Sequence, residues 1–219
     1  MILPAAIAIV ALAAAPAAAS DSAGYGQAFV DAFAAACVPE RLSYPGTKAN
    51  AQSLGWTDAA RTDHPELAAV LAITDAAATE AADEMQATFE YALYSKPVAD
   101  APHHLVVSRS SFVIGEPDDP LNPWVYIGCY LYNFDAAQPI DPAPMTALIA
   151  KPISHEVDED GLVSYVWGPP CPMPRTGDSY LTFIAEDSPH AAATGFTGLM
   201  VKFETSEPDP GEVVPETYC

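Results

Sequence analysis

The chain has few basic residues: 8 Lys and Arg stand against 29 Asp and Glu in 219 residues, a formal net charge of −21. Such a charge repels phosphate groups, which excludes nucleic acid as a partner and disfavours anionic membrane surfaces. A cationic or envelope protein partner, or a small ligand, is the partner to expect. The acidic excess also has a simpler interpretation, because a large net charge by itself keeps a protein in solution.

The sequence also lacks the familiar motifs of catalysis. It has no Gly-x-Ser-x-Gly, no glycine-rich phosphate loop and no HExxH zinc motif. The serines of the segment Ser108-Arg109-Ser110-Ser111 follow His103 and His104, but hydroxyl groups at a strand end are usually solvated. We therefore predict no cofactor, and the catalytic residues, if there are any, are unknown. A secreted hydrolase that uses His104 or His155 with a carboxylate is the alternative to a non-enzymatic protein.

Apolar runs of membrane-spanning length are absent after residue 19. Residues 1–19 are apolar up to Leu12 and end in Ala17-Ala18-Ala19, the small-residue pattern of a cleavage site. We predict a signal peptide over 1–19, cleavage before Ser20, no membrane span after cleavage, and a periplasmic or extracellular protein. No basic residue precedes the apolar stretch, which leaves the true start codon open. An uncleaved membrane anchor is the alternative.

Cysteine is scarce as well, with only Cys37, Cys129, Cys171 and Cys219. An even number in an exported chain predicts two disulfides, and the spacing fits neither a zinc site nor a CxxC redox pair. Four cysteines allow three pairings. Residues 205–219 form an acidic, proline-rich tail that should stay loose unless Cys219 tethers it. Cys171, which lies in a proline-rich loop, is the partner that we favour for Cys219.

Residues 20–204 predict a single domain with helices first and strands later, because the hydrophobic period changes to two from Met85 onward. The predicted helices are 26–37, one capped by Thr47, one capped by Asp63, an Ala-rich stretch 75–84 that extends or follows it, and 142–148. The predicted strands are 85–93, 104–108, 124–134, 153–157, 162–167, 179–185 and 198–205. We expect a disulfide-bonded α+β fold, with N-terminal helices packed on one face of an antiparallel sheet of five to seven strands.

Aromatic residues concentrate on one predicted strand. Alternation places five of them on the same side: Trp124, Tyr126, Tyr130, Tyr132 and Phe134. Trp167 lies with Tyr165 on a later predicted strand. Such rigid, amphipathic rings suit a binding surface for carbohydrate, peptide or an apolar ligand. The alternative is that helices cover this face and the rings form core.

Two acidic loops offer oxygen atoms of the kind that bind calcium. The first contains Glu116, Asp118, Asp119 and Asn122, and the second is the predicted hairpin turn at residues 158–161. Neither has the EF-hand spacing, and acidic turns in a protein of this charge are usually solvated. We therefore predict no metal site and regard the first loop as the one candidate to test.

Three features together resemble small exported proteins of Gram-negative bacteria. They are the helical segment 29–33 leading to Cys37, the helix end Leu54-Gly55-Trp56, and Cys129 within a strand. Such proteins have no settled activity, so the resemblance implies only an exported protein and a disulfide between Cys37 and Cys129. We expect a non-enzymatic binding or accessory protein.

Overall fold

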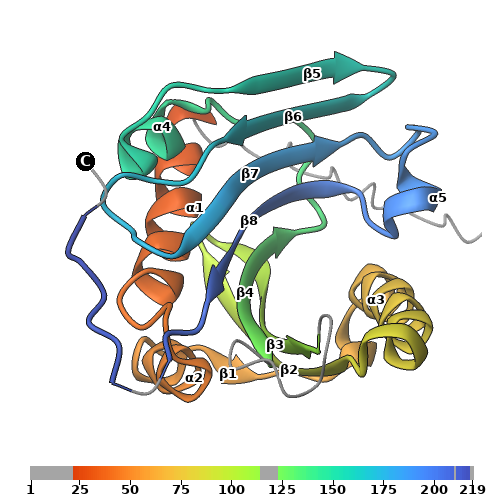
Figure 1. Ribbon diagram of the computed structural model, residues 1–219. Coiled ribbons are helices and arrows are strands. Elements are labelled where there is room, and N and C mark those ends of the chain that lie inside the picture. The colour runs from red at the N-terminus through yellow and green to blue at the C-terminus, as the bar shows by residue number, and fades with distance from the viewer. Residues whose placement is uncertain (1–21, 114–122, 210, 218–219) are drawn as a thin grey trace, which may run out of the picture.

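The computed structural model describes residues 22–113, 123–209 and 211–217. Its centre is one antiparallel sheet in the order β1-β2-β3-β4-β8-β7-β6-β5 (Figure 1). The strands are β1 (Thr57–Asp58), β2 (Thr88–Val98), β3 (Ala101–Phe112), β4 (Trp124–Asn133), β5 (His155–Glu159), β6 (Leu162–Trp167), β7 (Thr176–Ile184) and β8 (Gly198–Ser206). The helices are α1 (Ser22–Cys37), α2 (Tyr44–Ser53), the 3-10 turn η1 (Arg61–Asp63), α3 (Pro65–Met85), α4 (Ala143–Ile149) and α5 (Ala191–Thr194).

The sheet consists of two antiparallel runs that meet at one pair of strands. Strands β1 to β4 follow one another in order, β5 to β8 follow in the reverse direction across the sheet, and β8 pairs with β4. Gly198 begins β8 with φ +80°, and a Cβ there would lie 2.3 Å from the carbonyl oxygen of Asn133, so the close approach requires glycine. Because β4 pairs with β3 on one side and with β8 on the other, the predicted central strand 124–134 is confirmed.

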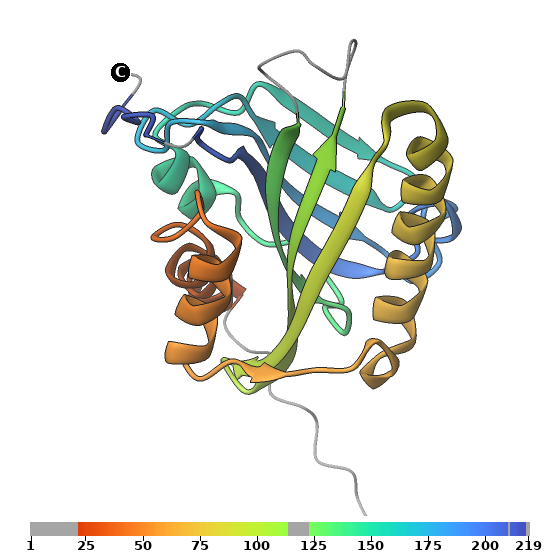
Figure 2. The ribbon, with the colours of Figure 1, turned by 60° about the horizontal axis from the view of Figure 1, so that its bottom comes forward.

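Helices cover both faces of the sheet, as Figure 2 shows. The larger buried cluster joins α1, α2 and α4 to one face through side chains such as Phe33, Leu105 and Val107. The second cluster joins α3 to the other face through Leu67, Leu71 and Val106. Neighbouring residues of β3 thus belong to different cores, as strand alternation requires.

Two parts of the predicted architecture were wrong. The sheet has eight strands where five to seven were expected, and the additional one, β1, has two exposed residues, too few to form a periodic pattern. The early helices do not share one face, because α3 packs opposite α1 and α2. Sequence periodicity could not assign that face, since the central strands are apolar on both sides.

Several element ends also differ from the prediction. The β2–β3 hairpin continues through Pro97 and Pro102 to a two-residue turn at Ala99 and Asp100, both with positive φ. Ser43 caps α2 in place of Thr47, because its hydroxyl accepts the Gly46 N–H. The predicted hairpin at residues 158–161 is confirmed, with Asp160 and Gly161 at positive φ.

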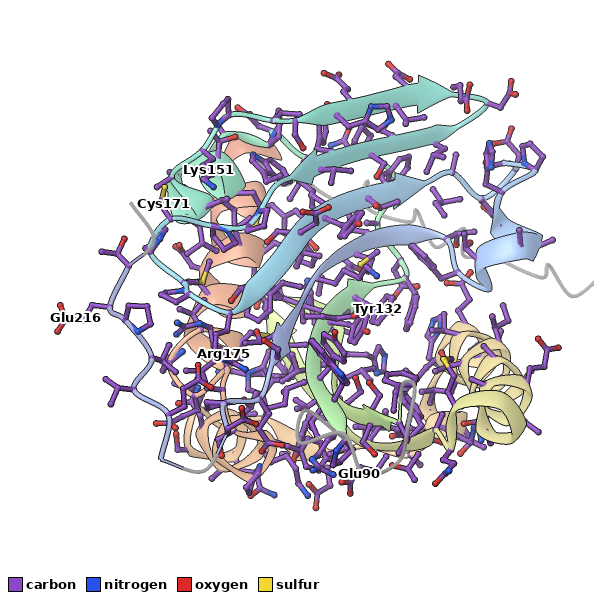
Figure 3. All side chains as sticks on the ribbon, in the orientation of Figure 1. Glu90, Tyr132, Lys151, Cys171, Arg175 and Glu216 are labelled. Carbon is purple, nitrogen blue, oxygen red and sulfur yellow. A yellow bond between two sulfur atoms is a disulfide. The ribbon has the colours of Figure 1, made fainter. Side chains whose placement is uncertain are left out.

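A disulfide between Cys37 and Cys129 links the end of α1 to the middle of β4, and both residues are buried. Cys219 and residues 1–21 lie outside the described residues, so the Cys171–Cys219 pair and the signal peptide stay predictions. Arg175, labelled in Figure 3, lies beside the C-terminal segment and donates to the carbonyl oxygens of Ser206 and Glu207. Among the described residues, no helix is long and apolar enough to cross a bilayer.

Candidate functional site

Helix α3 has two halves that meet the sheet differently. The residues that face the sheet follow helical spacing: Leu67, Leu71, Thr74, Ala78 and Ala81. The two leucines fill the space between helix and sheet and are fully buried. The later residues are too short to fill it. They leave a hollow of about 420 Å³ between the second half of α3 and strands β2, β3 and β4, which we call the α3 hollow.

The helix is held over this hollow at both ends. Its first turn is capped by His64, whose Nδ1 accepts the Glu66 N–H at 3.3 Å. At its last residue, the carbonyl oxygen of Met85 accepts the Val113 N–H at 2.8 Å. Hydrogen bonds therefore fix both ends of α3, and the helix passes over the hollow between them.

The floor of the hollow is made of small residues set between rings. Ser108, Ser110 and Gly128 lie on the side of the sheet that faces α3, and Phe89, Phe112 and Tyr126 line the same space. Small residues on the floor thus oppose alanines on the helix. Volumes of a few hundred Å³ with mostly apolar walls and a few polar groups are typical of small-molecule sites.

Polar groups also line the hollow, among them the Tyr130 hydroxyl and the Glu204 carboxylate. In the sheet register, Gly128 lies between Ser108 of β3 and Glu204 of β8. Because Gly128 has no side chain, the Tyr130 ring lies back over it; a Cβ there would be 2.6 Å from that ring. The hydroxyl then donates to Glu204 Oε1 at 2.7 Å.

Lys202 lies in the next row of the sheet. Its direct neighbours across the ladder are Tyr130 of β4 and Tyr180 of β7, and its Nζ lies 5.6 Å and 4.9 Å from the centres of their rings. Glu204, two residues along β8 and on the same face, has Oε1 3.9 Å from Nζ. Two rings and one carboxylate therefore position the ammonium on the face of the sheet that carries α3.

Titration of the two tyrosines is strongly disfavoured. Burial raises the pKa of Tyr130 well above its ordinary value, and the neighbouring Glu204 carboxylate raises it further. Burial also raises the pKa of Tyr180, with Asp178 and Glu204 adding to the effect. Both phenols stay protonated at neutral pH, so they serve as hydrogen-bond donors and not as bases.

The structure brings three of the predicted aromatic residues to this site. Tyr126 and Tyr130 line the α3 hollow, while Trp124 begins β4 at its edge with 40% of its surface exposed. Tyr132, labelled in Figure 3, is buried instead, stacked on Phe134 with ring centres 5.1 Å apart. The aromatic side of β4 is thus core at one end and open at the other.

Trp167 lies elsewhere. It is fully buried in the cluster beneath α1 and α4, where its indole Nε1 donates to Thr146 Oγ1 at 3.1 Å. Trp167 and the aromatic residues of β4 are therefore on opposite faces of the sheet.

The histidines do not assemble a hydrolytic site. His103 lies against Tyr25 and Phe29 on the α1 face, while His104 packs between His64 and Phe134 on the α3 face. His104 Nδ1 is buried without a hydrogen bond in the described part of the chain. His155 is exposed on the edge strand β5. Ser108 is four residues along β3 from His104, on the order of 13 Å away.

No group of three or more His, Cys, Asp or Glu side chains in the described ranges could hold a metal ion. The candidate calcium loop with Glu116, Asp118, Asp119 and Asn122 lies outside the described residues.

Sequence reasoning did not find Tyr180, Lys202 and Glu204. Alternation in the predicted strand 198–205 already placed Lys202 and Glu204 on one side. It could not show that Glu204 lies beside Tyr130, 74 residues away in the chain. The sequence also shows the alanine-rich stretch 75–84, but it does not show which strands these alanines face, so it could not predict a hollow there.

Comparison of the chain with protein-family models, with curated proteins and with solved structures finds no match.

Proposed function

We propose that this protein is a non-enzymatic binding protein that holds a small, largely apolar ligand in the α3 hollow. The observation that supports this most directly is the mismatch along α3, where alanines replace leucines over a floor of Ser108, Ser110 and Gly128. A core would be expected to close such a space, because buried surfaces pack to high density. An open, ring-lined space held under a supported helix is instead what a small ligand needs.

The site favours binding over catalysis for a chemical reason. The Tyr130 phenol is held in the protonated form, and Glu204, which lines the hollow, already accepts its hydroxyl group. In the described part of the chain, no histidine lines the α3 hollow. A nucleophile activated by a base, as hydrolysis requires, is therefore not assembled there.

We also propose that the protein is exported, to the periplasm or outside the cell. The predicted signal peptide supports this, and so does the Cys37–Cys129 disulfide, since such bonds persist in oxidising compartments. An acidic surface and a binding site for an apolar molecule suit a carrier or accessory protein in an aqueous compartment.

The experiment uses the neutral apolar dye N-phenyl-1-naphthylamine, whose fluorescence rises in an apolar site. Wild-type protein should bind it saturably, one molecule per chain. Ala78→Leu places a leucine in the hollow and should weaken binding about tenfold or more. It should also raise the free energy of unfolding by about 1 kcal/mol, because it fills a cavity. A lower affinity for the dye together with a higher free energy of unfolding would show that Ala78→Leu acts by filling the hollow.

Ala76→Leu is the matched control, since Ala76 is exposed on the same helix and does not line the hollow. Its affinity for the dye should equal that of the wild type. The proposal is wrong if the wild type does not bind the dye, or if both leucine variants lose affinity equally.

A further inference from the structure

A second hollow of about 520 Å³ continues the first along the same face of the sheet. It lies over β4, β8 and β7, which are neighbours in Figure 1, and it shares Tyr126 and Glu204 with the α3 hollow. We call it the strand hollow. The two spaces differ in chemistry, because alanines and phenylalanines line the first, whereas Arg175, Asp178 and Lys202 line only the second.

From this arrangement we infer that the ligand is amphipathic: its apolar part lies in the α3 hollow, and an uncharged, hydroxylated ring such as a sugar lies in the strand hollow. This inference rests on the binding function proposed above and names the class of ligand. A single molecule can occupy both spaces, since Tyr126 and Glu204 border each of them.

Charge selects an uncharged head group. Glu204 and Asp178 line the strand hollow, so an anionic group would face two carboxylates on a protein of net charge −21. A cationic group would face the Lys202 ammonium and the Arg175 guanidinium, which also lines this hollow. A hydroxyl group avoids both penalties, because it donates to a carboxylate and accepts from an ammonium.

Lys202 offers a hydrogen-bond donor and Glu204 an acceptor to such a hydroxyl group. The ammonium lies 3.9 Å from the carboxylate, too far for a hydrogen bond, so its N–H groups remain available on the side of the hollow. Glu204 uses Oε1 for the Tyr130 hydroxyl, which leaves Oε2 as an acceptor. A donor and an acceptor on neighbouring side chains suit two adjacent hydroxyl groups of a ring.

Aromatic surface completes the strand hollow. Trp124, 40% exposed, and the partly buried Tyr126 and Tyr180 line it. The faces of these rings carry partial negative charge, and the C–H groups on the face of a sugar ring carry partial positive charge, so the two surfaces attract. Polar groups beside a partly exposed indole thus favour a hydroxylated ring over a purely apolar one.

Calorimetry with probes that share an eight-carbon chain tests the inference: octyl β-D-glucoside below its micelle concentration, 1-octanol, octanoate and octylammonium. The glucoside should bind about tenfold more tightly than 1-octanol, and more tightly than either charged probe. Lys202→Met should reduce glucoside affinity to that of 1-octanol and leave 1-octanol unchanged. Trp124→Leu should likewise lower the affinity for the glucoside and leave the affinity for 1-octanol unchanged.

Lys48→Met is the matched control, because the Nζ of Lys48 also lies over a tyrosine ring, 4.8 Å from the centre of Tyr44, but outside both hollows. It should leave all four affinities unchanged. If 1-octanol binds but the glucoside binds no more tightly, or a charged probe binds best, the head-group inference is wrong and the proposed function stands. If no probe binds, the proposed function fails and the inference fails with it.

Discussion

His103 and His104 are neighbours in the chain but have different surroundings, because β3 directs them to opposite faces. His103 is hydrogen-bonded at both ring nitrogens, to the Tyr25 hydroxyl and to the carbonyl oxygen of Ala101. His104 is nearly as buried, yet its Nδ1 has no partner in the described residues. Burial lowers the pKa of His104, the nearby His64 lowers it further, and Asp63 and Asp135 act in the opposite direction.

The lowered pKa of His104 predicts how the free energy of unfolding depends on pH. In the unfolded chain His104 should titrate near 6.5, whereas in the folded protein its pKa is lower. The unfolded state therefore binds more protons as pH falls below about 6.5, and the free energy of unfolding decreases until the folded-state pKa is passed. His104→Phe removes this contribution. Denaturant titrations between pH 7 and 5 should give a slope smaller by at most about 1.4 kcal/mol per pH unit.

His155→Phe serves as the control, because His155 is exposed on β5 and touches no core. It should leave the pH dependence of the wild type unchanged. An unaltered pH dependence in His104→Phe would show that the buried ring does not cause the loss of stability in acid.

At the scale of the element, α3 shows what periodicity can predict and what it cannot. A helix that begins just after Asp63 followed from the sequence, and the structure confirms its start at Pro65, although His64 and not Asp63 is its cap. The face that α3 covers did not follow, since β3 and β4 are apolar on both sides. Without that face, the alanines at 77, 78 and 81 had no interpretation beyond good helix formers.

The Cys37–Cys129 disulfide joins two elements and should stabilise their packing. It closes a separation of 92 residues, so the chain-entropy account predicts that the double variant Cys37→Ala/Cys129→Ala loses about 4.6 kcal/mol of unfolding free energy. Urea titration of the variant and the wild type would measure this. Ala35→Ser, on the exposed face of α1, should change stability little. A loss below about 1 kcal/mol in the double variant would mean that helix and strand hold each other without the bond.

At the scale of the whole molecule, the order of the strands decides which residues meet. Seven of the eight strands were predicted from alternation and turn residues, because both depend on local sequence. The candidate site was only half visible, since Trp124, Tyr126 and Tyr130 share one strand, whereas Tyr180, Lys202 and Glu204 join them through the β4–β8 and β8–β7 pairs. Pairing between distant segments leaves no local signal.

The proposed export concerns the whole chain, and it can be tested directly. Intact-mass measurement of protein recovered from its native host should give a chain that begins at Ser20 or close to it, since Ala17-Ala18-Ala19 is the predicted cleavage site. Recovery of a chain that still contains Met1 would overturn cleavage.

The insertion of β8 between β4 and β7 has a consequence for the order of folding. Helices α1 to α3, strands β1 to β4 and both cysteines of the Cys37–Cys129 bond lie within residues 22–133, so this part has the means to assemble early. Its β4 edge, rich in tyrosine, then has no partner until residues 198–206 arrive. An unpaired strand edge invites association with other chains. Strand β8, which follows the other seven strands in the chain, thus pairs with the β4 edge and ends the period in which that edge can associate with other chains.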